Sequence, residues 1–356
     1  MKLMLLLLLL SFNSYSSCHQ GSASVDLRKT QVEIFSSLPV LDQGADGYCY
    51  AYTGKFLYDY QRYQKALKNK SSALNLGTTS PAWAAALGMR EGSDFNDDGG
   101  FTCNVVKGLS LKPKNCVHTS LQDHAFHDLG PQIYRFLFDS DSLVNKYQGS
   151  ASSMWGQFPV MNEAEFKSNS LKGEKLIMRD GFVNFQRKVR NALSGRSIDS
   201  KSAASPFTYY DLVRKSHYNK DYTKLSASFA LSVVERSCTN WSPTIKSSCK
   251  ELPAYNLDRI DQELTKGNPV GISYCSRFLQ DPAYRGFPQT TPQADCGMHA
   301  SAVIGRKLDS RGTCQYLIRN SWGINKVKYG WKTDKGDIWV DMEALNDNIR
   351  DYQIVN

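Results

Sequence analysis

Three residues of this 356-residue chain stand in contexts that suit a nucleophilic thiol. Cys49 opens a predicted helix directly after a turn-forming stretch at 42–47, and the backbone N–H groups at a helix start favour an anion and lower a thiol pKa. His299 begins a predicted strand and could supply the imidazole that pairs with a thiolate. Asn320 could fix that ring through its side-chain carbonyl. Because a thiolate attacks carbonyl carbon readily, the pattern predicts nucleophilic catalysis at an acyl group.

A fourth polar residue, Gln43, lies six residues before Cys49. When a carbonyl is attacked, its oxygen becomes an oxyanion that hydrogen-bond donors stabilise. The side-chain amide of Gln43 could donate to that oxygen, beside the backbone amide of Cys49. The functional hypothesis depends on the order Gln43, Cys49, His299 and Asn320 along the chain.

A helix and several strands would have to position these side chains. The helix is expected from Cys49 to about Lys68, because four aromatic residues recur on one of its faces, where core packing is the simplest interpretation. They are Tyr52, Phe56, Tyr60 and Tyr63. Strands are predicted in the last hundred residues, at Val270–Cys275, Ala300–Ile304, Gln315–Arg319 and Asp337–Asp341.

The motifs around these residues resemble those of the papain-like cysteine peptidases, over roughly 25–118 and 255–356. The matching segments are Pro39–Gly44, Gly47–Ala51, His299–Gly305 and Asn320–Gly323, the last reading Asn-Ser-Trp-Gly. The resemblance implies an α+β fold of two lobes, one helical and one β-barrel-like, with the active-site cleft between them. It also implies a cysteine endopeptidase that hydrolyses peptide bonds through a Cys-His-Asn triad and a thioester acyl-enzyme, with no cofactor and no metal. A peptide or protein would be the substrate.

The same resemblance implies roles for further residues. A substrate backbone would pair in extended form along a rim made by Gly99, Gly100 and Phe101. Ala300, next to the histidine, would line the pocket for the second residue before the scissile bond, and Met298 would also border the substrate. Trp322 would shield the bond between Asn320 and His299 from water. The segment Val25–Arg28 resembles the start of the mature enzymes.

Several positions depart from the family pattern. Asp46 replaces a cysteine, so one familiar disulfide cannot form, and Tyr48 replaces a small residue before the nucleophile. Met298 stands where the family has an aspartate before the histidine. The family places its histidine about 130–150 residues after the cysteine. Here the interval from Cys49 to His299 is 250 residues, so an insertion of about 100 residues is expected. A pro-segment is not expected.

These observations divide the chain into four segments. They are a signal peptide at 1–17, whose boundary falls between 17 and 24; a helical lobe with the nucleophile at 25–120; a basic, Ser- and Lys-rich insertion with part of the core at 121–255; and a β-rich lobe at 256–356. The signal is read from Lys2 and the apolar run Leu3–Leu10, which is shorter than the about 20 residues that span a bilayer. We therefore expect a secreted or periplasmic protein without a transmembrane segment. Cys18 offers lipid anchoring as an alternative.

Most of the net charge of +9 falls in one part of the insertion. Residues 165–224 hold 13 Lys and Arg against 6 Asp and Glu. A solvated basic face is one interpretation, and contact with an anionic surface is the other. Specific binding of nucleic acid is not expected.

The remaining cysteines are expected to form disulfides in an exported protein. Without Cys18 and Cys49 they number seven, so at least one should lack a partner within the chain, and close spacing favours the pairs Cys103/Cys116 and Cys238/Cys249. A calcium loop beginning at Asp94 lacks its closing glutamate, because Val105 stands at that position. A zinc site at Cys116 with nearby histidines is a weaker interpretation. Two functional alternatives stay open: an inactive papain-like peptide-binding protein, and a cell-wall peptide amidase.

Overall fold

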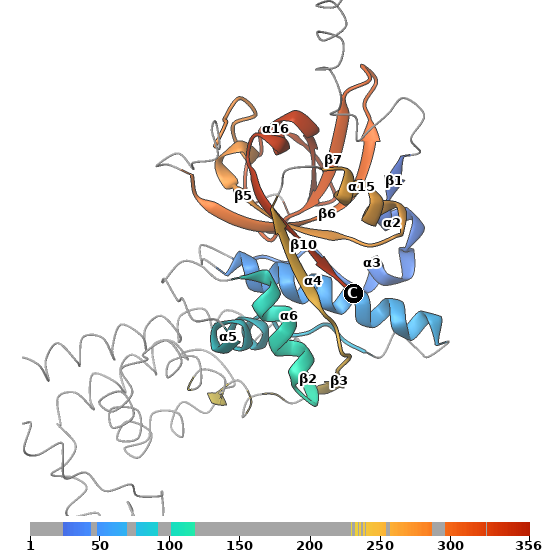
Figure 1. The fold of residues 1–356 in the computed structure, drawn as a ribbon, viewed down its shortest axis with the longest axis vertical. Helices are drawn as coiled ribbons and strands as arrows, with labels where there is room; N and C mark the ends of the chain where they lie inside the picture. The colour runs from blue at the N-terminus through green and yellow to red at the C-terminus, as the bar shows by residue number, and fades with distance from the viewer. Residues whose placement is uncertain are drawn as a thin grey trace, which may run out of the picture. The chain divides into compact units, whose positions relative to one another are not determined.

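The computed structural model of the protein describes two compact units (Figure 1). The described residues are 24–43, 48–69, 76–91, 101–117, 229, 232–233, 235, 238, 240–253, 257–286, 296–324 and 326–356. The sheet unit comprises Met1–Ser36 and Glu251–Ile354, and the helical unit comprises Ser37–Lys250 and Val355–Asn356. The expected signal peptide, Cys18, Gly99, Gly100 and the basic stretch 165–224 lie outside the described residues. Among the described residues, no helix is long and apolar enough to cross a membrane.

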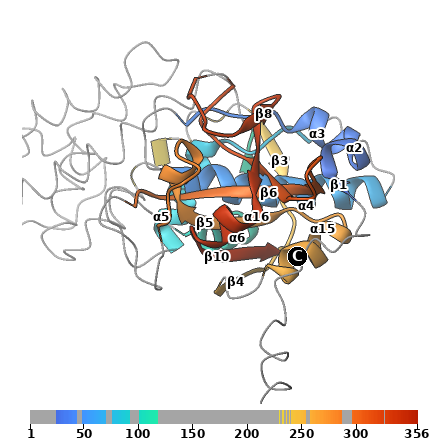
Figure 2. The ribbon, with the colours of Figure 1, turned by 90° about the horizontal axis from the view of Figure 1, so that it is seen from above.

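The sheet unit is built around one large sheet of eight strands, ordered β4-β10-β5-β6-β7-β9-β8, with β1 paired to β6. Its strands are β1 (Val25–Asp26), β4 (Cys249–Pro253), β5 (Val270–Cys275), β6 (Met298–Leu308), β7 (Cys314–Arg319), β8 (Lys332–Asp334), β9 (Asp337–Asp341) and β10 (Ile349–Val355). The pairs from β10 through β5, β6 and β7 to β9 are antiparallel, as are β8–β9 and β1–β6. Figure 2 shows β4 and β10 side by side at one edge.

Apolar runs form the central strands of this sheet. Ile272 of β5, Val303 of β6, Ile318 of β7 and Val340 of β9 are all fully buried. Continuous β-branched and aliphatic runs are typical of strands that are covered on both faces. Short helices flank the sheet: α2 (Leu27–Thr30), α15 (Asp258–Thr265), the 3-10 helix η2 (Ser276–Leu279) and α16 (Met342–Asn346).

The register of the sheet brings the predicted histidine and asparagine into reach of each other. Tyr274 of β5 lies opposite His299 of β6, and Ala302 of β6 lies opposite Arg319 of β7. Asn320 follows directly after β7, so its side chain can meet the first residues of β6. Successive side chains of a strand point to opposite faces, so His299 and Ser301 share one face.

The helical unit contains α4 (Cys49–Lys68), α5 (Pro81–Glu91) and α6 (Thr102–Leu111), with the short pair β2 (Lys114–Cys116) and β3 (Trp241–Pro243). Tyr52, Phe56, Tyr60 and Tyr63 of α4 are all at most 8 % exposed, which confirms the expected packing of the aromatic face. Glycine allows close helix contact, because a Cβ added to Gly54 of α4 would lie 2.7 Å from the Cβ of Val105 in α6.

An ionic cluster is buried next to the aromatic face of α4. Asp59 accepts hydrogen bonds from Arg62 at 2.7 Å, from the backbone N–H of Thr79 at 2.7 Å and from the hydroxyl of Thr79 at 2.6 Å. Lys55 lies 3.6 Å from the same carboxylate. Buried charges need such partners because their desolvation is costly. The cluster therefore ties the segment before α5 to the middle of α4.

The predicted α+β class is confirmed, because one unit carries the helices α4 to α6 and the other carries a large, mainly antiparallel sheet. The helix expected from Cys49 to about Lys68 is observed with those bounds. The four predicted strands are also confirmed, with the segment expected at Ala300–Ile304 extended to the bounds of β6, Met298–Leu308.

The expected pairs Cys103/Cys116 and Cys238/Cys249 are wrong. The disulfides among the described residues include Cys103–Cys249, Cys116–Cys238 and Cys275–Cys296. Cys103 lies at the start of α6 and Cys116 lies beyond its end, and a helix of this length rises about 1.5 Å per residue. Each of the two cysteines is instead bonded to a partner 146 or 122 residues away along the chain.

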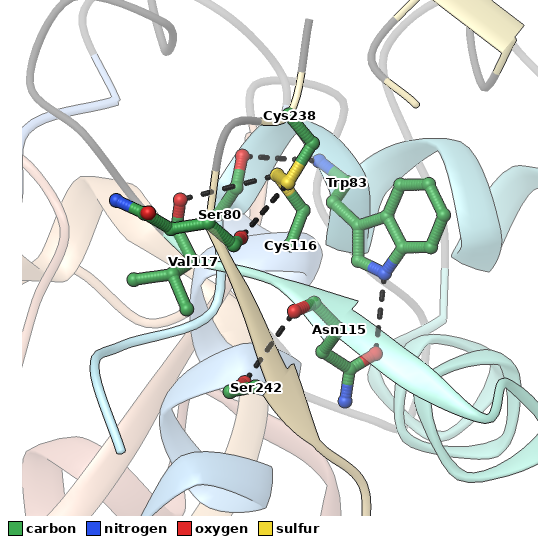
Figure 3. The surroundings of a disulfide bond; sticks show 8 residues. Ser80, Trp83, Asn115, Cys116, Val117, Cys238 and Ser242 are labelled. Carbon is green, nitrogen blue, oxygen red and sulfur yellow. Dashed lines mark hydrogen bonds between the residues drawn. A yellow bond between two sulfur atoms is a disulfide. The ribbon is translucent and has the colours of Figure 1, made fainter. Parts of the chain in front are cut away.

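The expectation of an unpaired cysteine among the seven is also wrong, since Cys314 too is disulfide-bonded. Figure 3 shows the surroundings of the bond between Cys116 and Cys238. Next to it, the Trp83 indole donates to the side-chain oxygen of Asn115 at 3.2 Å. The backbone N–H of Ser80 donates to the carbonyl of Cys116 at 2.8 Å. The disulfide therefore lies among hydrogen-bonded residues of the helical unit. Because the sulfur of Cys116 is bonded to Cys238, it is not available as a zinc-ligating thiolate.

Candidate active site

Cys49 is the first residue of α4, a helix of 20 residues. Its side chain is 8 % exposed, and its thiol is not part of a disulfide. The preceding Tyr48 is the N-cap and makes no side-chain cap hydrogen bond. The helix start directs backbone N–H groups and the positive end of the helix dipole toward this position, which stabilises a thiolate relative to a thiol.

Gln43 lies in the same unit, five residues before this N-cap. It is 4 % exposed. The segment that carries it is anchored to α4, because the Tyr52 hydroxyl donates to the backbone carbonyl of Asp42 at 3.2 Å. Tyr52 stands on the first turn of the helix that Cys49 opens. The aromatic face of α4 thus holds the segment of Gln43 close to the helix start.

His299 and Asn320 are joined in the sheet unit by a hydrogen bond of 2.6 Å between Nε2 and Oδ1. An amide oxygen can only accept, so Nε2 carries the proton and Nδ1 keeps its lone pair. The imidazole is 6 % exposed, and its burial lowers the pKa of His299 to about 4, although the hydrogen bond to Asn320 acts to raise it. The ring is therefore neutral at pH 7, in the tautomer whose Nδ1 can accept a proton.

The side chain of Asn320 is itself held from several sides. Its Oδ1 accepts from the backbone N–H of Ser321 at 2.8 Å and from the hydroxyl of Ser301 at 3.1 Å. Its Nδ2 donates to the hydroxyl of Tyr329 at 3.1 Å. Asn320 is 2 % exposed. The amide group therefore has one orientation that satisfies all of its neighbours, with the oxygen toward the imidazole.

Aromatic rings enclose the pair. Trp322 packs against His299 with ring centroids 4.7 Å apart, and it stacks on Tyr329 at 6.1 Å with an angle of 2° between the planes. Tyr274 meets His299 edge-on at 5.6 Å. Apolar rings next to a hydrogen bond keep water away from it and lower the local dielectric constant, which strengthens the bond.

The structure brings together His299, Asn320 and Trp322 in the sheet unit, and it places Gln43 and Cys49 in the helical unit. Of the expected substrate-binding residues, Met298 is 40 % exposed, Ala300 is 5 % exposed and Phe101, the N-cap of α6, is 46 % exposed. Gly99 and Gly100 lie outside the described residues, as do Asp94 of the calcium-loop interpretation and the histidines of the zinc interpretation. Within the part of the chain that the structure describes, no group of three or more His, Cys, Asp or Glu could hold a metal ion.

Three residues that sequence reasoning missed lie against the pair: Ser301, Tyr329 and Tyr274. Ser301 could have been found, because a polar residue two positions after His299 on a buried strand shares its face. Tyr329 lies nine positions after Asn320, and Tyr274 comes from another strand. No spacing within the sequence marks either of these two.

No family model matches the chain, and no curated protein matches it. Several solved structures are similar. They include xylellain, a cysteine protease from Xylella fastidiosa, with a TM-score of 0.44 and 15 % identity, covering 96 % of this chain and 89 % of that chain. The bromelain protease from Ananas comosus has a TM-score of 0.41 and 11 % identity, covering 92 % and 96 %. Procathepsin L 3 of Tenebrio molitor larval midgut has a TM-score of 0.40 and 15 % identity, covering 95 % and 71 %.

Proposed function

We propose that this protein is a papain-like cysteine endopeptidase. The observation that carries the proposal is the buried hydrogen bond of 2.6 Å from His299 Nε2 to Asn320 Oδ1, which leaves Nδ1 as a base. A cysteine at the start of a long helix supplies the matching nucleophile. The motif residues around both positions, including the Asn-Ser-Trp-Gly segment, support the same reaction.

The proposed reaction proceeds in two stages. Nδ1 of His299 takes the proton of the Cys49 thiol, and the thiolate attacks the peptide carbonyl carbon. The side-chain amide of Gln43 and the backbone N–H of Cys49 stabilise the oxyanion that forms. The imidazolium then gives its proton to the leaving amine as the C–N bond breaks, which leaves a thioester. A water molecule loses a proton to Nδ1 and attacks the thioester, and the acid product leaves as the thiol is restored.

The burial of His299 has a direct consequence for this reaction. A neutral imidazole with a pKa of about 4 is a poor place for a positive charge, because burial penalises the charged form. A thiolate beside the ring would offset that penalty, since an opposite charge favours the protonated imidazole. In this proposal the two charges therefore form together and vanish together.

We also propose that the protein acts outside the cytoplasm. Disulfides such as Cys103–Cys249, Cys116–Cys238 and Cys275–Cys296 form and persist in oxidising compartments. The apolar run after Lys2 supports export as well.

The first test compares the wild-type protein with Cys49→Ala. Hydrolysis of an unfolded protein or a peptide library should fall by about 10⁴-fold or more, because the nucleophile is lost. An epoxysuccinyl thiol probe should label Cys49 in the wild type and nothing in the variant, as judged by intact mass. Val32→Ala, at a side chain that is 61 % exposed, serves as a control that should retain full activity.

Three other outcomes would contradict the proposal. Peptide binding without hydrolysis and without labelling of Cys49 would identify an inactive binding protein. Release of stem peptides from peptidoglycan, with protein substrates left intact, would identify a cell-wall amidase. Hydrolysis that survives in pure Cys49→Ala protein would exclude Cys49 as the nucleophile.

A further inference from the structure

The orientation of the Asn320 side chain decides which nitrogen of His299 carries the proton. The two ends of an amide have nearly the same shape, but one end accepts hydrogen bonds and the other donates them. If the amide turned over, Nδ2–H would face the imidazole, and Nε2 would have to accept. The proton would then move to Nδ1, and His299 could no longer take a proton from a thiol.

Two side chains hold the amide against such a turn. Ser301 donates its hydroxyl proton to Oδ1 at 3.1 Å, and the Tyr329 hydroxyl accepts from Nδ2 at 3.1 Å. If the amide were reversed, the Tyr329 hydroxyl would face an oxygen and Ser301 would face an N–H. The backbone N–H of Ser321, which donates to Oδ1 at 2.8 Å, would then face another N–H donor and lose its hydrogen bond.

Tyr274 fixes the direction of the Ser301 hydroxyl. Its own hydroxyl lies 2.8 Å from Ser301 Oγ, and both atoms are buried. Because Ser301 gives its proton to Asn320, its oxygen accepts from Tyr274. The hydrogen bonds therefore run in one direction, from Tyr274 to Ser301 to Asn320. Hydrogen bonds in such a chain polarise and strengthen one another.

The same two tyrosines also pack around the imidazole. Tyr274 meets His299 edge-on at 5.6 Å. Tyr329 stacks on Trp322, which lies 4.7 Å from His299. Each tyrosine thus contributes its hydroxyl to the orientation of the amide and its ring to the enclosure of the histidine. Removal of a hydroxyl alone leaves the ring packing in place.

We infer that Ser301 and Tyr329 are positioning residues for His299: they hold Asn320 with Oδ1 toward Nε2–H and so keep Nδ1 available for proton transfer. This inference rests on the proposed peptidase function for its kinetic consequence. Both residues act through Asn320 and not through contact with the substrate.

The test uses Ser301→Ala, Tyr329→Phe and the double variant. In a Cys49→Ala background, ¹⁵N NMR of the imidazole at pH 7 reports the tautomer directly. The parent should show only Nε2–H, and the double variant should show a mixture with Nδ1–H. Tyr316→Phe is the matched control, because it removes a buried hydroxyl that donates to Asp261 at 3.0 Å elsewhere in the same unit. It should leave the tautomer unchanged.

The kinetic arm uses the same substitutions with Cys49 intact. Each single variant should lower kcat with KM nearly unchanged, and the double variant should lower kcat further, in proportion to the fraction of the Nε2–H tautomer that is lost. A single Nε2–H tautomer in the double variant would overturn the inference, as would a kcat no lower than that of Tyr316→Phe. If the wild type hydrolyses nothing, the proposed function fails, and the NMR result alone decides whether Ser301 and Tyr329 set the tautomer.

Discussion

At the scale of single residues, His299 combines two properties that oppose each other. Its burial disfavours a positive charge, whereas its hydrogen bond to Asn320 favours one, and burial is the larger effect. The proposed reaction requires the ring to become charged for a short time. A ring that is neutral at rest and charged only beside a thiolate is suited to that task, because the charge then appears only when its counter-charge does.

This balance predicts a dependence of stability on pH. The pKa of His299 is about 4 in the folded protein and 6.5 for the exposed group, so the unfolded chain binds the proton more readily. The stabilising contribution of the neutral ring is therefore complete above about pH 6.5 and is lost as the pH falls toward 4. Between pH 7 and pH 5 the free energy of unfolding should decrease by about 2 kcal/mol through this group.

Urea denaturation at the two pH values measures that decrease. Cys49→Ala protein is compared with the same protein carrying His299→Gln, which cannot titrate. The variant should lack the decrease of about 2 kcal/mol, whatever its absolute stability. An equal pH dependence in both proteins would show that the buried imidazole is protonated more easily than its burial indicates.

The residues of the site differ in how well the sequence predicts them. Cys49, His299 and Asn320 stand in local contexts that can be read directly, since a helix start, a strand start and a short motif identify them. Ser301, Tyr274 and Tyr329 have no comparable signal. Their contacts depend on which residues of β5 and β6 stand opposite each other, and on the course of the chain after Asn320. A hydroxyl partner is specified by the fold and not by its neighbours in the sequence.

At the scale of elements, helices and strands with a regular pattern of apolar residues can be predicted from the sequence, whereas contacts between distant elements cannot. The aromatic face of α4 and the apolar runs of β5, β6, β7 and β9 are visible in the sequence because they repeat over a few residues. The ion pairs of Arg28 cannot be predicted from the sequence in this way. This side chain bonds Asp26 at 2.9 Å, Asp334 at 2.7 Å and Asp337 at 3.3 Å, and two of these partners are more than 300 residues away along the chain. Nothing local to Arg28 marks them.

The buried cluster of α4 provides a prediction at this scale. Asp59→Asn removes the carboxylate that Arg62, Lys55 and Thr79 share, and it leaves two buried cations without their anion. Breaking a buried pair in this way costs about 3–5 kcal/mol. The free energy of unfolding from urea or guanidinium titration should fall by that amount.

A matched control is Asp347→Asn in the sheet unit. Asp347 also pairs with an arginine, Arg285, at 2.7 Å, but its side chain is 43 % exposed. An exposed ion pair contributes about 0–1 kcal/mol, so this substitution should have little effect. If both substitutions lower the free energy of unfolding equally, the Asp59 cluster contributes no more to stability than an exposed ion pair.

At the scale of the whole molecule, two disulfides close the helical unit, one nested within the other along the sequence. Cys103–Cys249 spans 146 residues of sequence, and Cys116–Cys238 spans 122 within it. The β2–β3 pair continues the inner closure, and the backbone N–H of Val117 donates to the carbonyl of Asn240 at 2.9 Å. Val117 and Asn240 therefore lie side by side, although they are far apart along the chain. These long-range pairs could not be derived from spacing, which favoured the nearest cysteines.

Removal of the inner bond tests its contribution. Cys116→Ala with Cys238→Ala should lower the free energy of unfolding by about 2–5 kcal/mol, because a long loop gains entropy in the unfolded chain when it is opened. The loss should fall at the lower end of this range, since the outer bond still restrains the same segment. Chemical denaturation under non-reducing conditions measures it. An unchanged free energy of unfolding would indicate that the β2–β3 pair restrains this loop without the inner disulfide.

The two nested disulfides, with Val117 paired to Asn240 beside the inner one, determine what happens when a protease cleaves the chain between them. A protease that cleaves one bond anywhere between Cys116 and Cys238 produces two fragments, yet both disulfides still join them. Such a nicked protein would migrate as one band without reducing agent and as two bands with it. The segment between these cysteines could thus be cut, by another enzyme or by a second copy of this protein, while the two sides of the helical unit stay covalently attached.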